Sequence, residues 1–290
     1  MSRPAAFAAP VVACAALLAA AGADAACPAP EEAELRAAAW LAGQPVASYG
    51  EGLSLADAYC GQDIYVARLE AALGPRIGYK VGFTGKASQE HFGVSEPARG
   101  VLFAPMILET GAELPADFGV RGLFEADLVV TIKDAAVMDA TTPLEAAAAL
   151  EAVVPFIELP DIVVPEGQIL DGANIIALNV MPRYGVVGPA IPVEADEAFV
   201  AAFAEFDAIL LNATGAEIER SKGSALLGNP LNALLWLVAD LREAGLALEP
   251  GDIVSLGSLG RPHPTVAGAT ITLRYEGLPG GASEVSVSFR

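Results

Sequence analysis

The spacing of apolar positions changes after about residue 75, from a helical period to alternation. Before that point, apolar residues recur at helical spacing in two segments, 29–45 and 54–75. We expect the first helix to end near Gly43 and Pro45. In the second, Ser54 or Asp57 caps the start, and Gly74-Pro75 stops the helix. The chain therefore begins its ordered part with helices.

Strands are predicted from residue 76 onward. In "RIGYKVGF" the residues Ile77, Tyr79, Val81 and Phe83 share one face, which places Lys80 on the other. Lys80 stands between two glycines, and glycine inside a strand often marks the close approach of a ligand or of backbone. A surface lysine on a half-exposed strand is the simpler alternative. Further strands are predicted in "RGVLFAPM", "GLFEADLVVTI", "VVPFIEL", "YGVVGP", "FDAILL" and "AEIERS".

One strong helix returns late in the chain, and strands close it. "NPLNALLWLVADLREAGL" has Pro230 in its first turn and Gly245 at its end. "GDIVSLGSLG", "ATITLRYEG" and "EVSVSF" are the closing strands. Strands and helices do not alternate regularly, which counts against a doubly wound sheet. We find no GxGxxG motif or phosphate-binding loop.

Composition and charge narrow the possible partners. The 290 residues are 54% hydrophobic, enough for a sizeable core, and the formal net charge is -20. A chain this acidic repels phosphates, so no nucleic-acid partner is expected. A small anionic substrate would need a local positive centre, supplied by Lys, Arg or a bound metal.

The N-terminus has the pattern of a secretory signal. Arg3 precedes an apolar run of small residues, and "ADA" stands ahead of Ala26. We expect cleavage after Ala25, export to the periplasm, and no membrane association afterwards. The predicted organisation is a signal peptide at 1–25, a helical segment at 26–75 and a strand-rich domain at 76–290. Cys27 and Cys60 would remain after cleavage; an exported protein is permitted a disulfide, but sequence does not say whether these two meet.

Three acids lie in apolar, strand-like surroundings. Glu125 and Asp127 are two residues apart and share one face of a strand, and Glu158 lies in "PFIELPD". They would be solvated on an edge strand, or they would hold a hard cation such as Mg²⁺, which prefers oxygen ligands and leaves coordination positions open for substrate.

Longer motifs carry a resemblance to a known family. "GYKVGFTGKASQEHFGVSEPARGVLF", "FEADLVV", "PFIELPD", "ALNVMPRYGVVGP" and the segment 222–271 resemble blocks of the 2-oxopent-4-enoate hydratase and 4-oxalocrotonate decarboxylase branch of the fumarylacetoacetate hydrolase superfamily. The resemblance runs from about Leu53 to the C-terminus. It implies an α+β fold, a mixed twisted β-roll with an N-terminal helical segment, and a homo-oligomer. Familiar members of this branch are cytoplasmic enzymes of aromatic-compound catabolism.

The resemblance also implies a reaction and a set of site residues. A divalent metal, Mg²⁺ or Mn²⁺, would be held by Glu125, Asp127 and Glu158. Lys80 would be the catalytic lysine that steadies negative charge or shuttles a proton near the metal. The implied activity is metal-dependent addition of water to a 2-oxo-alk-4-enoate, a small anionic 2-oxo acid. The residues implied in substrate binding are Asn179, Gly82, Thr84 and Ser258.

Departures from the family pattern leave alternatives open. Asp127 stands where Glu is usual, Leu178 replaces an acid, and Asn229 replaces a His. The shorter Asp127 either reaches the metal or leaves room for a water. The alternatives are a decarboxylase, an acylpyruvate hydrolase, or an exported binder of oxo acids with weakened catalysis. Neither His91 nor His263 is placed to activate water, which disfavours hydrolysis.

Overall fold

The computed structural model describes residues 27–290, so the predicted signal peptide lies outside the described residues. The helices are α1 Pro30–Leu41, α2 Leu55–Leu73, α3 Lys86–Phe92, α4 Pro143–Ala148, α5 Gly172–Ala177, α6 Glu197–Glu205 and α7 Pro230–Glu243. Short 3₁₀ turns lie at Ala104–Met106, Ala135–Asp139 and Gly223–Ala225. Both helices predicted before residue 75, and the late one, are confirmed.

The strands build two mixed sheets that share one core. They are β1 Arg76–Gly82, β2 Ala98–Phe103, β3 Ile107–Glu109, β4 Ala112–Leu114, β5 Leu123–Ile132, β6 Leu150–Pro160, β7 Pro182–Val187, β8 Ile191–Pro192, β9 Asp207–Asn212, β10 Glu217–Lys222, β11 Ile253–Ser255, β12 His263–Pro264, β13 Thr270–Glu276 and β14 Ser283–Phe289. The larger sheet has the order β2-β1-β11-β5-β6-β7-β3, and β12 and β8 pair with β5 and β6. The smaller sheet has the order β10-β9-β13-β14-β4. The predicted mixed, twisted α+β architecture is confirmed.

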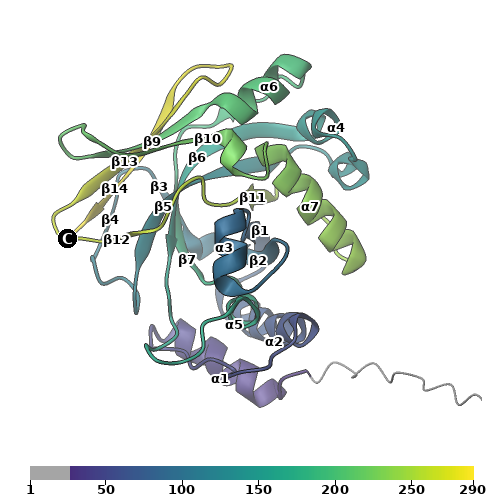
Figure 1. The fold of residues 1–290 in the computed structure, drawn as a ribbon, viewed down its shortest axis with the longest axis vertical. Coiled ribbons are helices and arrows are strands. Elements are labelled where there is room, and N and C mark those ends of the chain that lie inside the picture. The colour runs from purple at the N-terminus through teal and green to yellow at the C-terminus, as the bar shows by residue number, and fades with distance from the viewer. Residues whose placement is uncertain (1–26) are drawn as a thin grey trace, which may run out of the picture.

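Most of the helices gather in two groups around the larger sheet. Figure 1 shows α1, α2 and α5 gathered at one end of the molecule, and α4 and α7 together beside the sheet. The segment Gly223–Glu243 is apolar and long enough to cross a membrane, but half of its apolar window is buried inside the fold, so α7 is a core helix here. The boundary at residue 75 between a helical segment and a catalytic domain stays a prediction.

Local sequence explains where the long helices begin and end. Ser54, not Asp57, caps α2: its hydroxyl accepts the Asp57 N–H at 3.1 Å. Asn229 caps α7 by accepting the Leu231 N–H at 3.0 Å, and Pro230 fills the first helical position, where no N–H is needed. Gly74 ends α2 with a φ of 91°, a conformation that favours glycine.

A disulfide joins the start of the described chain to α2. Cys27 and Cys60 are bonded, with their Cα atoms 5.4 Å apart. The bond closes a loop that contains all of α1, and the packing of α1 on α2 lies inside this loop. The pairing that sequence left open is therefore settled by the geometry.

Candidate active site

One cavity of about 320 Å³ opens between the central strands of the larger sheet and α3. Lys80, Glu125 and Glu158 project into it from β1, β5 and β6, so three of the predicted site residues meet there. Gly82, Thr84 and Ser258 line the same cavity. Most of the remaining lining is apolar: Val81, Phe83, Phe92, Leu123, Pro160, Ile162, Ile175, Val180 and Pro262. The cavity thus combines a small charged group with an apolar wall.

Strand pairing puts two carboxylates side by side. In the antiparallel ladder of β5 and β6, Glu125 lies directly opposite Glu158. Two like charges in this position repel each other, so a nearby cation, or a proton on one of them, stabilises the pair. Lys80 supplies one: its ammonium group forms an ion pair with the Glu158 carboxylate, and both side chains are almost fully buried.

The surroundings shift the pKa values of these groups. Burial raises the pKa of Glu125 well above its usual range, and the neighbouring Glu158 raises it further, while Lys80 lowers it. Burial alone would lower the pKa of Lys80, but Glu158 and Glu125 together more than offset this and raise it. Lys80 is therefore a firmly protonated cation, and Glu125 tends to hold a proton when no second cation is near.

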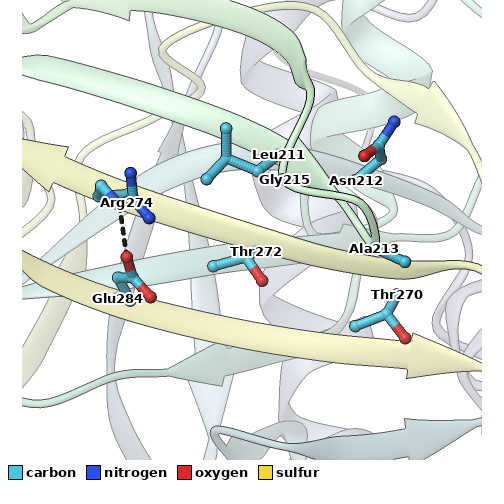
Figure 2. Close-up of a pocket in the computed structure, with 8 residues that line it drawn as sticks. All are labelled: Leu211, Asn212, Ala213, Gly215, Thr270, Thr272, Arg274 and Glu284. Carbon is cyan, nitrogen blue, oxygen red and sulfur yellow. Dashed lines mark hydrogen bonds and ion pairs between the residues drawn. The ribbon is translucent and has the colours of Figure 1, made fainter.

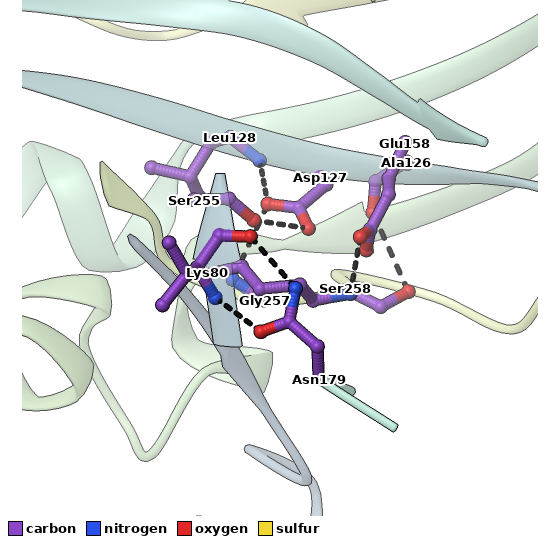
Figure 3. Close-up of polar contacts among 10 residues, drawn as sticks. Lys80, Ala126, Asp127, Leu128, Glu158, Asn179, Ser255, Gly257 and Ser258 are labelled. Atoms are coloured by element: carbon purple, nitrogen blue, oxygen red, sulfur yellow. Dashed lines mark hydrogen bonds and ion pairs between the residues drawn. The ribbon is translucent and has the colours of Figure 1, made fainter. Parts of the chain in front are cut away.

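Asp127 lies one step deeper along β5 and faces other partners. Its carboxylate accepts hydrogen bonds from Ser255 Oγ at 2.9 Å, from the Gly257 N–H at 3.2 Å and from the Leu128 N–H (Figure 3). The side chain is fully buried and does not line the cavity. Burial raises the pKa of Asp127, and so does Glu158. Of the three predicted metal ligands, the structure brings Glu125 and Glu158 together and places Asp127 behind them.

The residues present fit a divalent cation at the carboxylate pair. Two paired carboxylates on a buried ladder, open to a cavity, provide hard oxygen donors that favour Mg²⁺ or Mn²⁺. As the side chains stand, residues 27–290 contain no group of three or more His, Cys, Asp or Glu close enough to hold a metal. The Asp127 carboxylate already accepts hydrogen bonds from Ser255 and Gly257, and its role as a metal ligand stays a prediction.

The raised pKa of Glu125 predicts a pH dependence for the metal-free protein. The unfolded chain loses this proton near pH 4.5, while the folded protein keeps it to higher pH. Stability should therefore fall as pH rises from about 4.5 towards the native pKa, by up to ~1.4 kcal/mol per pH unit. In EDTA, Glu125→Gln should show a flatter profile and a higher Tm at pH 7 than the parent protein. Parallel profiles for the two proteins would contradict the assignment.

Gly78 and Gly82, on either side of Lys80, allow other parts of the chain to approach β1 closely, as the sequence predicted. A Cβ on Gly78 would lie 1.8 Å from the carbonyl oxygen of Ile253 in the adjacent β11. A Cβ on Gly82 would lie 2.5 Å from Val180 Cγ1, which forms part of the cavity wall. The first glycine allows close backbone approach, and the second allows the wall to close on the site.

Asn179 has a different place from the one expected of a substrate-binding residue. It is fully buried and outside the cavity lining, and its amide bridges the backbone of β2. The Val101 N–H donates to Oδ1 at 2.7 Å, and Nδ2 donates to the Val101 carbonyl at 2.9 Å. Asn179, Val180 and Met181 all have left-handed φ angles, 61°, 56° and 52°, which are costly for Val and Met. In this structure Asn179 anchors a strained turn that places Val180 in the wall, and its predicted substrate contact stays untested.

Asn179→Ala should destabilise the fold. It leaves a buried N–H and a buried carbonyl of Val101 without partners, which costs about 3 kcal/mol in unfolding free energy. Urea denaturation measures the loss. The matched control is Asn232→Ala. The half-buried Asn232 side chain makes one solvent-exposed bond to the Leu227 carbonyl, and its loss should cost under about 1 kcal/mol. Unchanged stability with a raised KM would instead identify Asn179 as a substrate ligand.

Two features of this region were missed from sequence. His263 stacks on Phe124, with ring centroids 5.2 Å apart, and its Nε2 lies 2.9 Å from Glu219 Oε2. Glu219 also accepts the Arg261 N–H, so this pair holds the loop that carries Ser258 to the cavity. The apolar wall was the second omission, because its residues come from separate segments that meet only in the fold.

A second hollow, of about 340 Å³, lies on the smaller sheet, and its lining has fewer charged groups than the cavity around Lys80. Figure 2 shows Thr270, Thr272 and Arg274 on β13 beside Glu284, with Leu211 and Asn212 nearby. Arg274, the cation of this hollow, is already paired with Glu284. The cavity around Lys80 is therefore the candidate active site.

Comparison with known proteins gives consistent relatives. No family model matches the chain. A 2-keto-4-pentenoate hydratase from Dechloromonas aromatica is 31% identical over 86% of this chain and 95% of its own length. A TodF product hydratase from Pseudomonas putida is 30% identical over 76% of this chain and 80% of its own length. A solved 4-oxalocrotonate decarboxylase from Pseudomonas putida, complexed with magnesium and adipate, has the same fold, with a TM-score of 0.76, 24% identity, and 90% and 97% of the two chains covered.

Proposed function

Because the chain belongs to the 2-keto-4-pentenoate hydratase family of the fumarylacetoacetate hydrolase superfamily, we propose that it is a metal-dependent hydro-lyase. It adds water to a 2-oxo-alk-4-enoate, formed from a 2-hydroxy-dienoate, and yields a 4-hydroxy-2-oxo acid. The observation that carries the proposal is the meeting of Lys80, Glu125 and Glu158 in one cavity. These three charged residues beside an apolar wall can bind a small organic acid, with its carboxylate near the charges and its carbon chain against the wall.

In this proposal some residues of the cavity stabilise charge on the substrate, and others exclude water. When bound, a divalent cation held by Glu125 and Glu158 would supply a Lewis acid for the head of the oxo acid. Lys80 stays protonated because of its carboxylate neighbours, so it presents a fixed positive charge to an enolate oxygen. Thr84 and Ser258 offer hydroxyl groups to the same space, and Phe83 and Val180 keep bulk water from the far wall.

The direct test is the Mg²⁺-dependent loss of dienoate ultraviolet absorbance, with product identification. We expect turnover of a 2-hydroxy-dienoate with Mg²⁺ or Mn²⁺ and none after chelation, with a 4-hydroxy-2-oxo acid as product. No turnover of any of several 2-hydroxy-dienoates by metal-loaded protein would remove the proposal. Release of CO₂ or of two carbon fragments would assign the site to a decarboxylase or a hydrolase instead.

Export to the periplasm and assembly into a homo-oligomer are also part of the proposal. The signal-like N-terminus and the Cys27–Cys60 disulfide support export, because disulfides persist in oxidising compartments. Fractionation of cells that express the full chain, with N-terminal sequencing, should find a periplasmic protein that begins at Ala26. A cytoplasmic protein that retains residues 1–25 would contradict this. Light scattering after gel filtration measures the oligomer.

A further inference from the structure

The strand that carries Lys80 also borders a hollow on its opposite face. Successive strand residues point to opposite sides, and in the β1–β2 ladder Tyr79 pairs with Val101 while Lys80 pairs with Gly100. Tyr79 and Val101 line a hollow of about 250 Å³ between these strands and α2, which Lys80 does not reach. This space is therefore separate from the candidate active site. We call it the α2 hollow, and its polar lining includes Gln62 and Asp63 of α2, Arg76 of β1 and Arg99 of β2.

Arg99 brings unused hydrogen-bond donors to the α2 hollow. The residue is only 6% exposed, and its guanidinium group stacks on Tyr59 and pairs through Nη1 with Asp240 at 2.7 Å. Its Nε and Nη2 atoms form no hydrogen bond with residues 27–290, yet neither atom is sealed from solvent, so they are open to the hollow that Arg99 lines. Arg76 lines the same space, although Asp252 pairs with it at 2.8 Å. Guanidinium donors of this kind bind a carboxylate.

Gln62 and Asp63 bring unused acceptors from the facing helix. Gln62 is 1% exposed, and its Nε2 donates to the carbonyls of Arg99 at 2.9 Å and Ile176 at 2.8 Å. These two bonds fix the amide, and its Oε1 accepts no hydrogen bond from residues 27–290 although it is not sealed from solvent. Asp63 has no ion pair among the same residues. Partial burial raises the pKa of Asp63 and the nearby Arg99 lowers it, so this carboxylate lies close to the guanidinium group.

We propose that the α2 hollow is a second binding site, for a small α-amino acid with an apolar side chain. The carboxylate of the ligand accepts hydrogen bonds from Arg99, and its ammonium group donates to Gln62 Oε1 and Asp63. The lining carries two basic and two acidic side chains, which are Arg76, Arg99, Asp63 and Glu70. A zwitterion matches both signs of charge, whereas a simple anion or a simple cation is repelled by one of them.

The rest of the lining favours an apolar side chain of modest size. Val66, Ala67 and Val101 border the hollow, and so does Leu246, an apolar residue that is 42% exposed. An apolar side chain gains free energy from burial against these groups. The volume of about 250 Å³ is below the usual range for drug-sized ligands, which suits a molecule as small as valine.

Titration calorimetry of metal-free protein in EDTA tests the proposal with L-alanine, L-valine and L-leucine. A Kd above about 10 mM for all three would overturn it. The tightest binder is then compared with its deaminated and decarboxylated analogues, which for valine are 3-methylbutanoate and isobutylamine. We expect each analogue to bind at least about tenfold more weakly than the amino acid, because each leaves one set of polar groups in the hollow unmatched. An analogue that binds as tightly as the amino acid would also overturn the proposal.

A surface variant tests whether the ligand lies in the α2 hollow. Asp63 is exposed on α2, so Asp63→Asn should fold normally, and it should weaken binding of the amino acid by about tenfold because the ammonium group loses its counter-charge. The matched control is Glu51→Gln, which removes an exposed acid ahead of α2 that does not line the hollow. The control should leave the Kd unchanged. Equal Kd values for Asp63→Asn and the parent protein would place the ligand elsewhere and remove the proposal.

The same titration separates the α2 hollow from the candidate active site. An amino acid could instead chelate a metal beside Glu125, so the Kd is measured again with Mg²⁺ and with Glu125→Gln. We expect neither change to alter it, because Glu125 does not line the hollow. If binding requires Mg²⁺ or is lost in Glu125→Gln, the ligand occupies the active site and the proposal fails. No substrate is used, so the outcome does not depend on the hydration activity proposed above.

Discussion

Lys80→Met should lower kcat by about 10³-fold while KM changes little. The ammonium group is the one cation of the chain that lines the cavity, within the described residues, and it is held against Glu158 at its base. Its charge counts most when negative charge builds on the enolate oxygen, so its loss should affect the chemical step more than binding. The measurement is steady-state hydration kinetics at saturating Mg²⁺.

Stability must be measured beside the kinetics, because the change also leaves Glu158 buried without its partner. Loss of one member of a buried ion pair costs about 3–5 kcal/mol, so Tm should fall in EDTA and recover in part with Mg²⁺. Lys80→Arg is the matched control, because it keeps the positive charge. Its larger planar group has little room, since Gly100 lies against the aliphatic part of the Lys80 side chain. A kcat for Lys80→Met within about tenfold of the parent value would show that Lys80 does not act in the chemical step.

Glu158→Gln should weaken metal binding far more than Asp127→Asn. Glu158 reaches the cavity beside Glu125, whereas the Asp127 carboxylate is occupied by Ser255 and Gly257. We expect the Kd of Mn²⁺ to rise on the order of 10³-fold for Glu158→Gln and about 10-fold for Asp127→Asn, the range for a residue that acts behind the ligands. Titration calorimetry of metal-stripped protein measures both values without any substrate.

The comparison of these two variants decides how Asp127 works. An effect of Asp127→Asn as large as that of Glu158→Gln would mean that the Asp127 carboxylate ligates the metal directly. Ser255→Ala provides a further control, because it removes one bond that holds Asp127 in place. If Asp127 acts behind the ligands, Ser255→Ala should weaken Mn²⁺ binding in the same direction as Asp127→Asn.

Short-range pattern singled out Lys80, Glu125 and Asp127, but it left a surface lysine and a solvated edge strand as alternatives. The metal-site roles, with Glu158 as the third ligand, followed from the family resemblance. Alternation in "RIGYKVGF" separates Lys80 from the core face, and the i, i+2 rule places Glu125 and Asp127 on one face. The rule does not say which side chain on that face reaches the cavity and which is buried behind it. The neighbouring segments determine these positions. Glu158 lies opposite Glu125, while Ser255 and Gly257, more than a hundred residues away in sequence, bind the Asp127 carboxylate.

Asn179 shows a second limit of sequence reasoning. Its motif predicted a substrate contact, but the structure uses its amide to bind Val101 across a turn of three left-handed residues. Such a run is unfavourable without glycine, so no local preference predicts it. The tertiary contacts with β2 hold it in place, and only they bring Val180 to the cavity wall.

The disulfide has a consequence for local unfolding. Helix α1 has no side-chain cap at its start and packs mainly on α2, so by itself it is the kind of terminal element that opens readily. With Cys27 bonded to Cys60, both ends of the segment are tied to the body of the protein, so opening of α1 gains less chain entropy than it would with a free end. A reduced protein should therefore exchange its α1 amide hydrogens and admit proteases near residues 27–45 well before the strands around Lys80 respond. The redox state of the compartment then sets how much of the molecule behaves as one cooperative unit.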